Sequence, residues 1–227
     1  MEGEFGDSWA SKLRHLTAIH VLGAGLKTER PANRLFHDIG ELGWRLVPVH
    51  PRDAGNALLG RPVRAELAQS SAPELVVFFL SPKASMSALL QLIRTTPRSG
   101  MPLLWFQPGA VDDGLMEVLE GSGYGFVTET CIVRFIQGRE LTPREPSPVG
   151  AWYKQVLSAK TNCSMWTVHQ PEGPSEPPSP DALEWCGDLH DLEFSNHIVP
   201  RYIRSLGRPG ETLTELGKRL AKDVTSA

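Results

Sequence analysis

The chain has 227 residues, of which 41% are hydrophobic and 22% charged; this composition is ordinary for a folded protein and excludes disorder of the whole. Its formal net charge of -3 gives no general attraction to nucleic acid or to an anionic membrane. No stretch has the apolar run of a signal peptide or a membrane span, and three cysteines indicate reduced thiols. We therefore expect a cytoplasmic protein with no nucleic acid and no membrane as partner.

Strands alternate with helices through the first two thirds of the chain. Short apolar runs bounded by glycine or proline predict the strands, and apolar residues at every third or fourth position predict the helices. The strands are expected at residues 17–22, 46–49, 75–80, 102–106 and 126–127, and the helical spacing covers residues 31–42, 86–93 and 112–119. This alternation predicts an α/β fold with a Rossmann-like, doubly wound parallel sheet.

We expect this domain to occupy residues 1–145. A small, mainly helical or irregular C-terminal extension follows over residues 146–227 and is expected to pack on the domain or on a partner subunit. Trp152, Trp166 and Trp185 give the extension a large apolar surface to bury. Thr212 and Glu215 have the spacing of a capping box, which predicts a last helix. The extension is thus the candidate surface for a homodimer or for another protein partner.

The residues in the loops at the carboxyl ends of the strands indicate the class of ligand, because parallel sheets bind ligands at that edge. The first loop reads Gly23-Ala24-Gly25, but Thr28 stands where a dinucleotide fingerprint has its third glycine. A helix beginning near Pro31 supplies N–H donors for a phosphate. A Gly-x-Gly after a strand is also an ordinary tight turn.

Basic residues cluster at the same predicted edge. The second strand ends in His50-Pro51-Arg52, where NAD enzymes usually carry an acidic residue for the ribose hydroxyls. An imidazole and a guanidinium favour an anion, such as the ribose phosphate of NADP or of coenzyme A (CoA). Further positive charge on this rim comes from Lys27, Arg30, Arg34 and Lys83. The alternative for each of them is a solvated surface position.

Six landmarks, in order along the chain, make this sequence resemble the CoA-binding domain family, which is related to the nucleotide-binding part of succinyl-CoA synthetase alpha subunits. The segments that carry the resemblance are Gly23-Ala24-Gly25, Pro31-Ala32-Asn33-Arg34, Val49-His50-Pro51, Phe79-Leu80-Ser81-Pro82, Trp105-Phe106-Gln107-Pro108-Gly109 and Glu129-Thr130-Cys131. Three residues depart from the family pattern: Gly25 replaces its serine, His50 its asparagine and Pro108 its acidic residue. The first two bear on the identity of the ligand more than on the fold.

The resemblance implies ligand contacts at the four loops. Together with the basic rim, the expected CoA-binding residues are Gly23, Ala24, Gly25, Lys27, Arg30, Pro31, Asn33, Arg34, His50, Pro51, Arg52, Ser81, Pro82, Lys83, Gln107, Pro108 and Gly109. Pro82 and Pro108 have a structural alternative as strand terminators. Gln107 has one as a bridge between two loops.

No catalytic motif stands out, and Cys131 is more typical of a buried structural thiol than of a nucleophile. In the extension, Cys163, His169, Cys186 and His190 are weak candidates for a zinc site, since their spacing is loose; we expect no metal.

Three functions remain open. The sequence favours a binding module for CoA or an acyl-CoA, without chemistry, acting as a sensor or carrier. The alternatives are an NADP-dependent oxidoreductase and a protein-interaction module whose crevice is vestigial.

Overall fold

The computed structural model describes residues 2–172 and 180–225, which form two compact units. The first unit contains residues 1–46 and 73–148, and the second contains residues 47–72 and 149–227. The second unit is therefore discontinuous in sequence. A single boundary near residue 145, as expected from the sequence, does not account for residues 47–72, which group with the C-terminal segment.

The first unit is built on a five-stranded parallel sheet with the strand order β2-β1-β5-β6-β7. The strands are β1 (Ala18–Leu22), β2 (Arg45–Val49, which runs into the second unit), β5 (Leu75–Phe78), β6 (Leu103–Phe106) and β7 (Phe126–Val127). The helices are α1 (Glu2–His15), α2 (Pro31–Ile39), α3 (Pro82–Thr95), α4 (Asp113–Ser122) and α5 (Ile132–Gly138), with a short 3-10 turn, η2, at Arg98–Gly100. The Rossmann-like α/β class is confirmed, and each predicted strand lies within a residue or two of its expected position.

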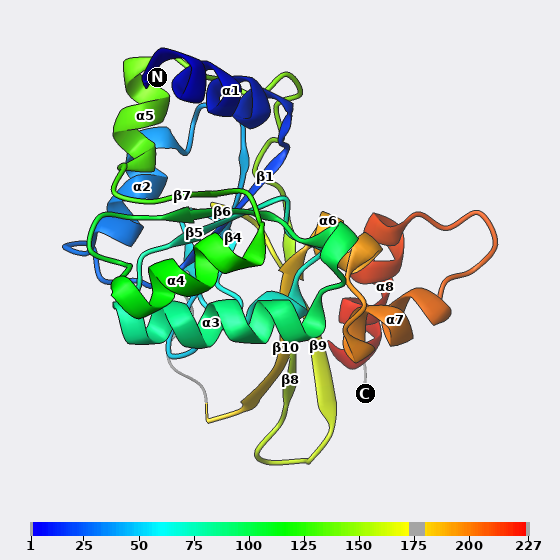
Figure 1. Cartoon of the computed structure of the whole chain (residues 1–227). Coiled ribbons are helices and arrows are strands. Elements are labelled where there is room, and N and C mark those ends of the chain that lie inside the picture. Colours follow the sequence, from blue (N-terminus) through cyan, green and yellow to red (C-terminus); the bar gives the residue numbers. More distant parts are fainter. Residues whose placement is uncertain (1, 173–179, 226–227) are drawn as a thin grey trace. The chain divides into compact units, whose positions relative to one another are not determined.

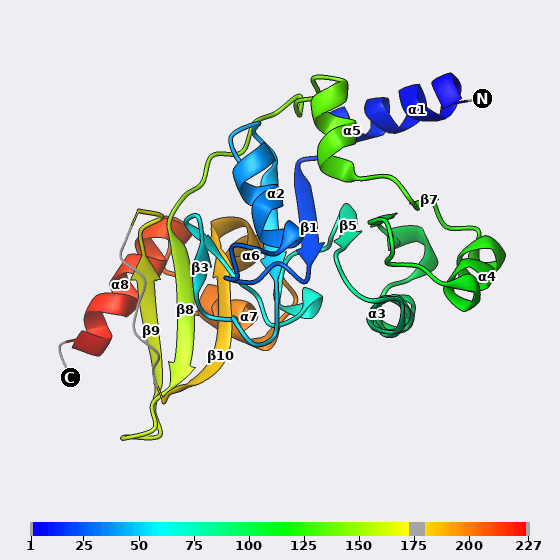
Figure 2. The same cartoon turned by 90° about the vertical axis from the view of Figure 1, so that its left-hand side faces the viewer.

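Helices cover both faces of this sheet. Figures 1 and 2 show α1, α2 and α5 on one face and α3 and α4 on the other. All five residues of β1 and all four of β5 are buried, as expected of central parallel strands covered on both sides. Such strands need continuous apolar runs, which is why the sequence predicts them well.

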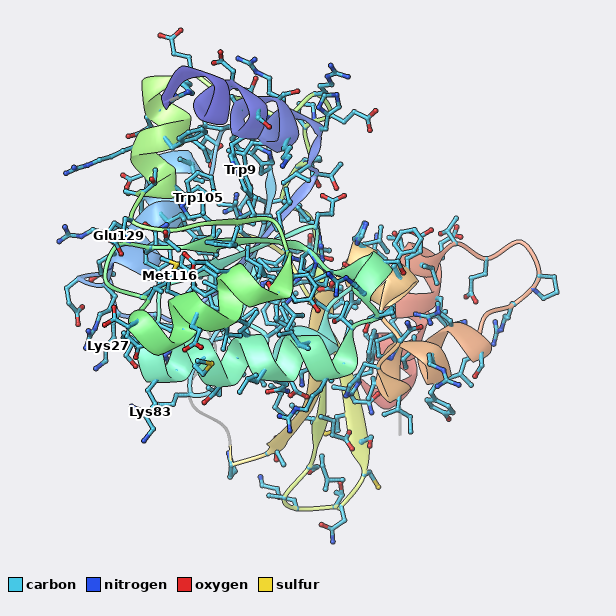
Figure 3. All side chains as sticks on the ribbon, viewed as in Figure 1. Trp9, Lys27, Lys83, Trp105, Met116 and Glu129 are labelled. Carbon is cyan, nitrogen blue, oxygen red and sulfur yellow. The ribbon has the colours of Figure 1, made fainter. Side chains whose placement is uncertain are left out.

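Helix α1 was not predicted, and three of its side chains anchor it. Trp9, Ala10 and Leu13 are buried. The Trp9 ring lies edge-on to the Trp105 ring, with the two centroids 5.7 Å apart; both side chains are labelled in Figure 3. The indole N–H of Trp44 donates to the Leu13 carbonyl at 3.2 Å. With so few apolar positions, the segment lacks the periodicity that would have indicated a helix.

The second unit has an antiparallel sheet of order β10-β8-β9 with helices against it. Its elements are β3 (Ala57–Leu58), β4 (Arg61–Pro62), the 3-10 turn η1 (Leu67–Gln69), β8 (Trp152–Leu157), β9 (Ser164–His169), β10 (Ala182–Asp188), α6 (Leu189–Phe194), α7 (Ile198–Ser205) and α8 (Leu213–Thr225). The helices of the C-terminal extension agree with expectation, but its three-stranded sheet was not predicted. Residues 170–180 are rich in proline, which predicts a loop, and residues 173–179 of this segment lie outside the described residues.

Two tryptophans of the extension, Trp166 and Trp185, belong to the core of this second unit. Trp166 and Trp185 stack with ring centroids 5.9 Å apart, and Tyr153 stacks on Trp166 at 5.6 Å. Each indole N–H is satisfied, that of Trp166 by the Gly217 carbonyl at 3.0 Å and that of Trp185 by the Gln69 carbonyl at 2.9 Å. None of the described helices is both long and apolar enough to cross a bilayer.

Candidate functional site

The candidate site is the carboxyl edge of β1, β5 and β6 in the first unit. These strands pair in parallel, so the segments that follow them open at one edge of the sheet. They contain the predicted residues of three loops: 23–34 after β1, 81–83 after β5 and 107–109 after β6. The structure thus brings three of the four predicted loops together within one unit.

Glycine at position 23 is required by the backbone rather than by a ligand. Its φ is +87°, and a Cβ atom there would lie 2.5 Å from the Phe79 carbonyl oxygen, far inside van der Waals contact. Gly23 therefore lets the chain leave β1 beside the end of β5. The next turn brings the Gly25 N–H to the Gly23 carbonyl at 3.2 Å.

Asn33 ties this loop to the first turn of α2. Its side chain is 1% exposed, and its amide nitrogen Nδ2 donates to the Gly25 carbonyl at 2.9 Å. Because only the nitrogen can donate to a carbonyl, this bond fixes the orientation of the amide. The other amide atom, Oδ1, is buried without a hydrogen-bond partner.

Two further buried polar atoms at this edge lack hydrogen-bond partners. Ser85, in the first turn of α3, is fully buried and its Oγ makes no hydrogen bond. Ser87, two residues along the same helix, instead donates to the Lys83 carbonyl at 3.1 Å. Gln107, directly after β6, is 6% exposed and its Nε2 has no partner. Buried polar atoms in native proteins are normally paired with protein, ordered water or a ligand.

The helix N-termini at this edge differ in how they are capped. Neither α2 nor α3 has a side chain that caps its first turn, and each begins with a proline. Helix α4, by contrast, is capped by Asp112, whose carboxylate accepts the Leu115 N–H at 2.9 Å. Proline has no N–H, and the Asn33 N–H already donates to the Arg30 carbonyl at 3.0 Å, so the other first-turn N–H groups of α2 and α3 are those available to an anion.

The basic rim of the first unit is exposed, as expected. Lys27, Arg30, Arg34 and Lys83 all lie at the surface. Figure 3 shows the labelled Lys27 and Lys83 at the same side of that view, near the start of α3. The three buried polar side chains of this edge, Asn33, Ser85 and Gln107, are neutral, and we call them the floor of the candidate site; the basic side chains of its rim are exposed.

The remaining predicted residues occupy ordinary positions. Gly109 has a φ of +79° with open space around it, in a turn closed by the Ala110 N–H and the Gln107 carbonyl at 2.9 Å. Pro82 is the first residue of α3. Ala24 is buried and Pro108 exposed. Ser85 was missed by the sequence analysis, because a serine inside a helical pattern carries no signal of burial.

The fourth loop belongs to the second unit. His50, Pro51 and Arg52 follow β2, and the His50 Nδ1 lies 3.2 Å from the Asp53 carboxylate. This histidine thus has an acidic neighbour of its own, whereas Arg52 is exposed. A contact of this loop with a ligand stays a prediction.

The weak zinc candidates are spread over the antiparallel sheet and helix α6. Cys163 precedes β9 and His169 ends it, and six extended residues at about 3.3 Å each separate them by about 20 Å. The His169 ring stacks on Trp152 with centroids 4.1 Å apart. Cys186 is buried, which raises the pKa of its thiol to about 11, and His190 contacts the Ser71 hydroxyl at 3.0 Å. Among the described residues, no three acidic, cysteine or histidine side chains are grouped to hold a metal ion.

Comparisons with known proteins agree with the fold of the first unit. A family model described as "CoA binding domain" matches residues 17–136. A solved protein from Thermus thermophilus is 26% identical, with a TM-score of 0.52, and the match covers 59% of this chain and 97% of that one. A hypothetical protein from Pyrococcus horikoshii OT3 is 25% identical, with a TM-score of 0.50 and coverage of 60% and 89%. The family match ends at residue 136, before β8 begins.

Proposed function

Since the chain belongs to the CoA binding domain family, we propose that it binds CoA or an acyl-CoA at the carboxyl edge of its parallel sheet, without carrying out chemistry on it. The observation that supports this most is the set of three buried polar atoms without partners: Asn33 Oδ1, Ser85 Oγ and Gln107 Nε2. Their side chains are two amides and a hydroxyl. Such groups bind and orient a ligand but do not move protons at neutral pH.

These three atoms also restrict which part of the ligand reaches the floor. Asn33 Oδ1 can only accept a hydrogen bond, whereas Gln107 Nε2 can only donate one. An ionised phosphate has acceptors alone, so it does not satisfy Asn33. A group with both donors and acceptors, such as an amide of the pantetheine arm or a ribose hydroxyl, is able to pair with either atom.

The phosphates of CoA are then bound by the rim. The exposed basic side chains Lys27, Arg30, Arg34 and Lys83 and the uncapped first turns of α2 and α3 are the groups in this unit that favour negative charge. In this proposal the neutral side chains of the floor form hydrogen bonds with amide or hydroxyl groups of the ligand, and the basic side chains of the rim bind its phosphates.

The test is thermal unfolding with CoA, acetyl-CoA, dephospho-CoA, NADP and NAD in parallel. A ligand at one hundred times its dissociation constant stabilises the protein by about 2.7 kcal/mol, and we expect that shift with CoA and none with NAD. A shift with NADP in place of CoA would favour an oxidoreductase. No shift with any ligand would contradict the proposal and favour an interaction module.

Two serines of α3 provide a matched pair for the floor. Ser85→Ala removes a hydroxyl that has no partner in the free protein, so stability should hold while the CoA affinity falls about three- to tenfold, the loss of one hydrogen bond. Ser87→Ala removes a hydroxyl bonded within its own helix and should leave the affinity unchanged. Equal effects of the two changes would argue against the floor as the binding surface.

Arg52→Glu tests whether the fourth loop contributes. If its guanidinium meets the ribose phosphate, charge reversal weakens CoA more than dephospho-CoA, which lacks that group. Isothermal titration of both ligands measures the difference. Equal weakening of the two would place Arg52 away from the phosphate.

A further inference from the structure

Helices α6 and α7 of the second unit carry a surface that is unusually apolar. Among the described residues, the three most exposed large apolar side chains are Ile198 at 74%, Tyr202 at 59% and Phe194 at 55%, and Leu189 is 39% exposed. All four lie between positions 189 and 202, and we call them the α6–α7 patch. An apolar surface of this kind marks an interaction site more often than chance exposure.

Helix α7 is packed into the second unit by other side chains. Helix α7 buries Val199, Pro200 and Ile203 against the core, whereas Ile198 and Tyr202 lie one turn apart on its remaining surface. The helix is therefore apolar on two sides, and a helix of that kind is normally covered on both. Figure 1 shows α6 and α7 next to each other, and their residues contact.

One acidic and one basic residue accompany the patch. Glu193 precedes Phe194 and Arg201 precedes Tyr202, and both are exposed. Within the described part of the chain, neither side chain takes part in an ion pair or hydrogen bond. Arg204, on the same helix, is instead held in place because its guanidinium donates to the carbonyls of Leu192 at 2.7 Å and Ser195 at 3.1 Å.

We propose that the α6–α7 patch is the contact face of a homodimer of this chain. A two-fold axis brings the same surface of both copies together, so a surface with one acid and one base is complementary to itself. Glu193 of one copy then faces Arg201 of the other, twice per dimer. A net charge of only -3 puts little general repulsion between two copies.

The exposed area suits the centre of such an interface. A fully accessible aromatic side chain offers roughly 200 Å², so Phe194 and Tyr202 each provide roughly 100 Å² at their observed exposure. With the two aliphatic side chains the patch supplies several hundred Å² per copy, and a stable interface buries about 800 Å² per partner. The polar surface around the patch makes up the rest, as in interfaces with an apolar centre and a polar rim.

Sedimentation velocity of the full chain over a range of concentrations tests the proposal. We expect a dimer, and we expect Ile198→Asp to raise its dissociation constant at least tenfold, because a charge would be buried at the centre. Leu90→Glu is the matched control, since Leu90 is 44% exposed on α3; this variant should remain dimeric. Far-UV circular dichroism confirms that both variants are folded.

The charges distinguish this dimer from nonspecific association. Glu193→Arg alone and Arg201→Glu alone each place like charges opposite one another and should weaken the dimer about tenfold or more. The double variant restores opposite charges and should restore the dimer. A monomeric wild type at all concentrations, a dimer insensitive to Ile198→Asp, or a double variant weaker than either single one would overturn the proposal.

Discussion

At the scale of single residues, the backbone of the first unit requires glycine at some positions and not at others. Gly23 has a left-handed backbone and no space for a side chain, since the Phe79 carbonyl stands in the way. Gly121, in the last turn of α4, is exposed and has nothing within 4 Å of a Cβ atom. The two positions therefore predict opposite effects of the same substitution.

Gly23→Ala is expected to destabilise the protein by roughly 2 kcal/mol or more, since a left-handed conformation and a backbone clash both oppose the new Cβ. Gly121→Ala should stabilise it by roughly 0.5–1 kcal/mol, because alanine is the better helix former. Urea denaturation of both variants measures the two changes. If Gly23→Ala were as stable as the wild type, the backbone role of Gly23 would be wrong.

A buried ion pair holds the two segments of the second unit together. Arg64 and Asp191 are both fully buried, and the Arg64 Nε donates to the Asp191 carboxylate at 2.9 Å, with a further contact from Nη2. The same carboxylate accepts the Ser71 N–H at 2.9 Å, and Asp188 adds a second acid at 2.9 Å from Nη2. Each charge is compensated only while the other segment is in place.

Asp191→Asn should therefore cost about 3 kcal/mol of stability, because it leaves the buried Arg64 guanidinium with only the partly exposed Asp188 as an acidic partner. A double change, Arg64→Met with Asp191→Leu, removes both charges and should recover much of that loss. Guanidinium denaturation provides the free energies. A single variant that unfolds at the wild-type midpoint would show that the pair contributes little.

At the scale of the elements, α7 begins with an unusual cap. His197 is its N-cap residue, and the Nδ1 atom accepts the Val199 N–H at 3.3 Å. Burial lowers the pKa of His197 below 6.5, and the charge of Glu66 opposes this shift to a lesser degree. A neutral ring can accept the bond, whereas a protonated one cannot.

Acid should therefore loosen α7. Because the folded-state pKa is the lower one, the unfolded chain binds the proton first. The contribution of His197 is present above about pH 6.5 and is lost as the pH falls through the folded-state pKa. His197→Asn keeps a capping side chain without titrating, so its melting temperature should depend less on pH between 5 and 7 than that of the wild type. Parallel slopes for the two proteins would contradict this role.

Elements differed in how far the sequence predicted them. The strands of the parallel sheet are continuous apolar runs such as Leu75–Phe78, so the local sequence pattern alone predicts their positions. The spacing of Thr212 and Glu215 also predicted the capping box of α8, and the Glu215 N–H donates to Thr212 Oγ1 at 3.3 Å as expected. The strands β8 to β10 each bury only some of their side chains, and β10 has an irregular register against β8, so strict alternation is lost.

The candidate site was predictable in its loops but not in its chemistry. Glycine and proline at strand ends located the edge, and Asn33 and Gln107 came from the family resemblance. Burial and unpaired atoms depend on the packing of helices on the sheet, which no local pattern encodes. For this reason Ser85 was missed, and the acidic neighbour of His50 was not foreseen.

At the scale of the whole molecule, the discontinuity of the second unit predicts the effect of truncation. Residues 47–72 supply Arg64 and Gln69, whose partners Asp191 and Trp185 lie in the C-terminal segment. A chain ending at Pro148 leaves these groups without partners. We expect trypsin to cut such a chain within residues 47–72 much faster than it cuts the full chain, with mass spectrometry identifying the sites. Equal resistance would mean that residues 47–72 fold without the C-terminal segment.

The same ion pair has a consequence for synthesis on the ribosome. Arg64 and Asp191 are separated by 127 positions, and translation at about 5–20 residues per second takes roughly 6–25 s to cover that distance. During this interval residues 47–72 have emerged, but the acid that neutralises Arg64 does not yet exist. The nascent chain therefore carries an incomplete second unit, with Arg64 lacking the Asp191 carboxylate, until residue 191 has been added.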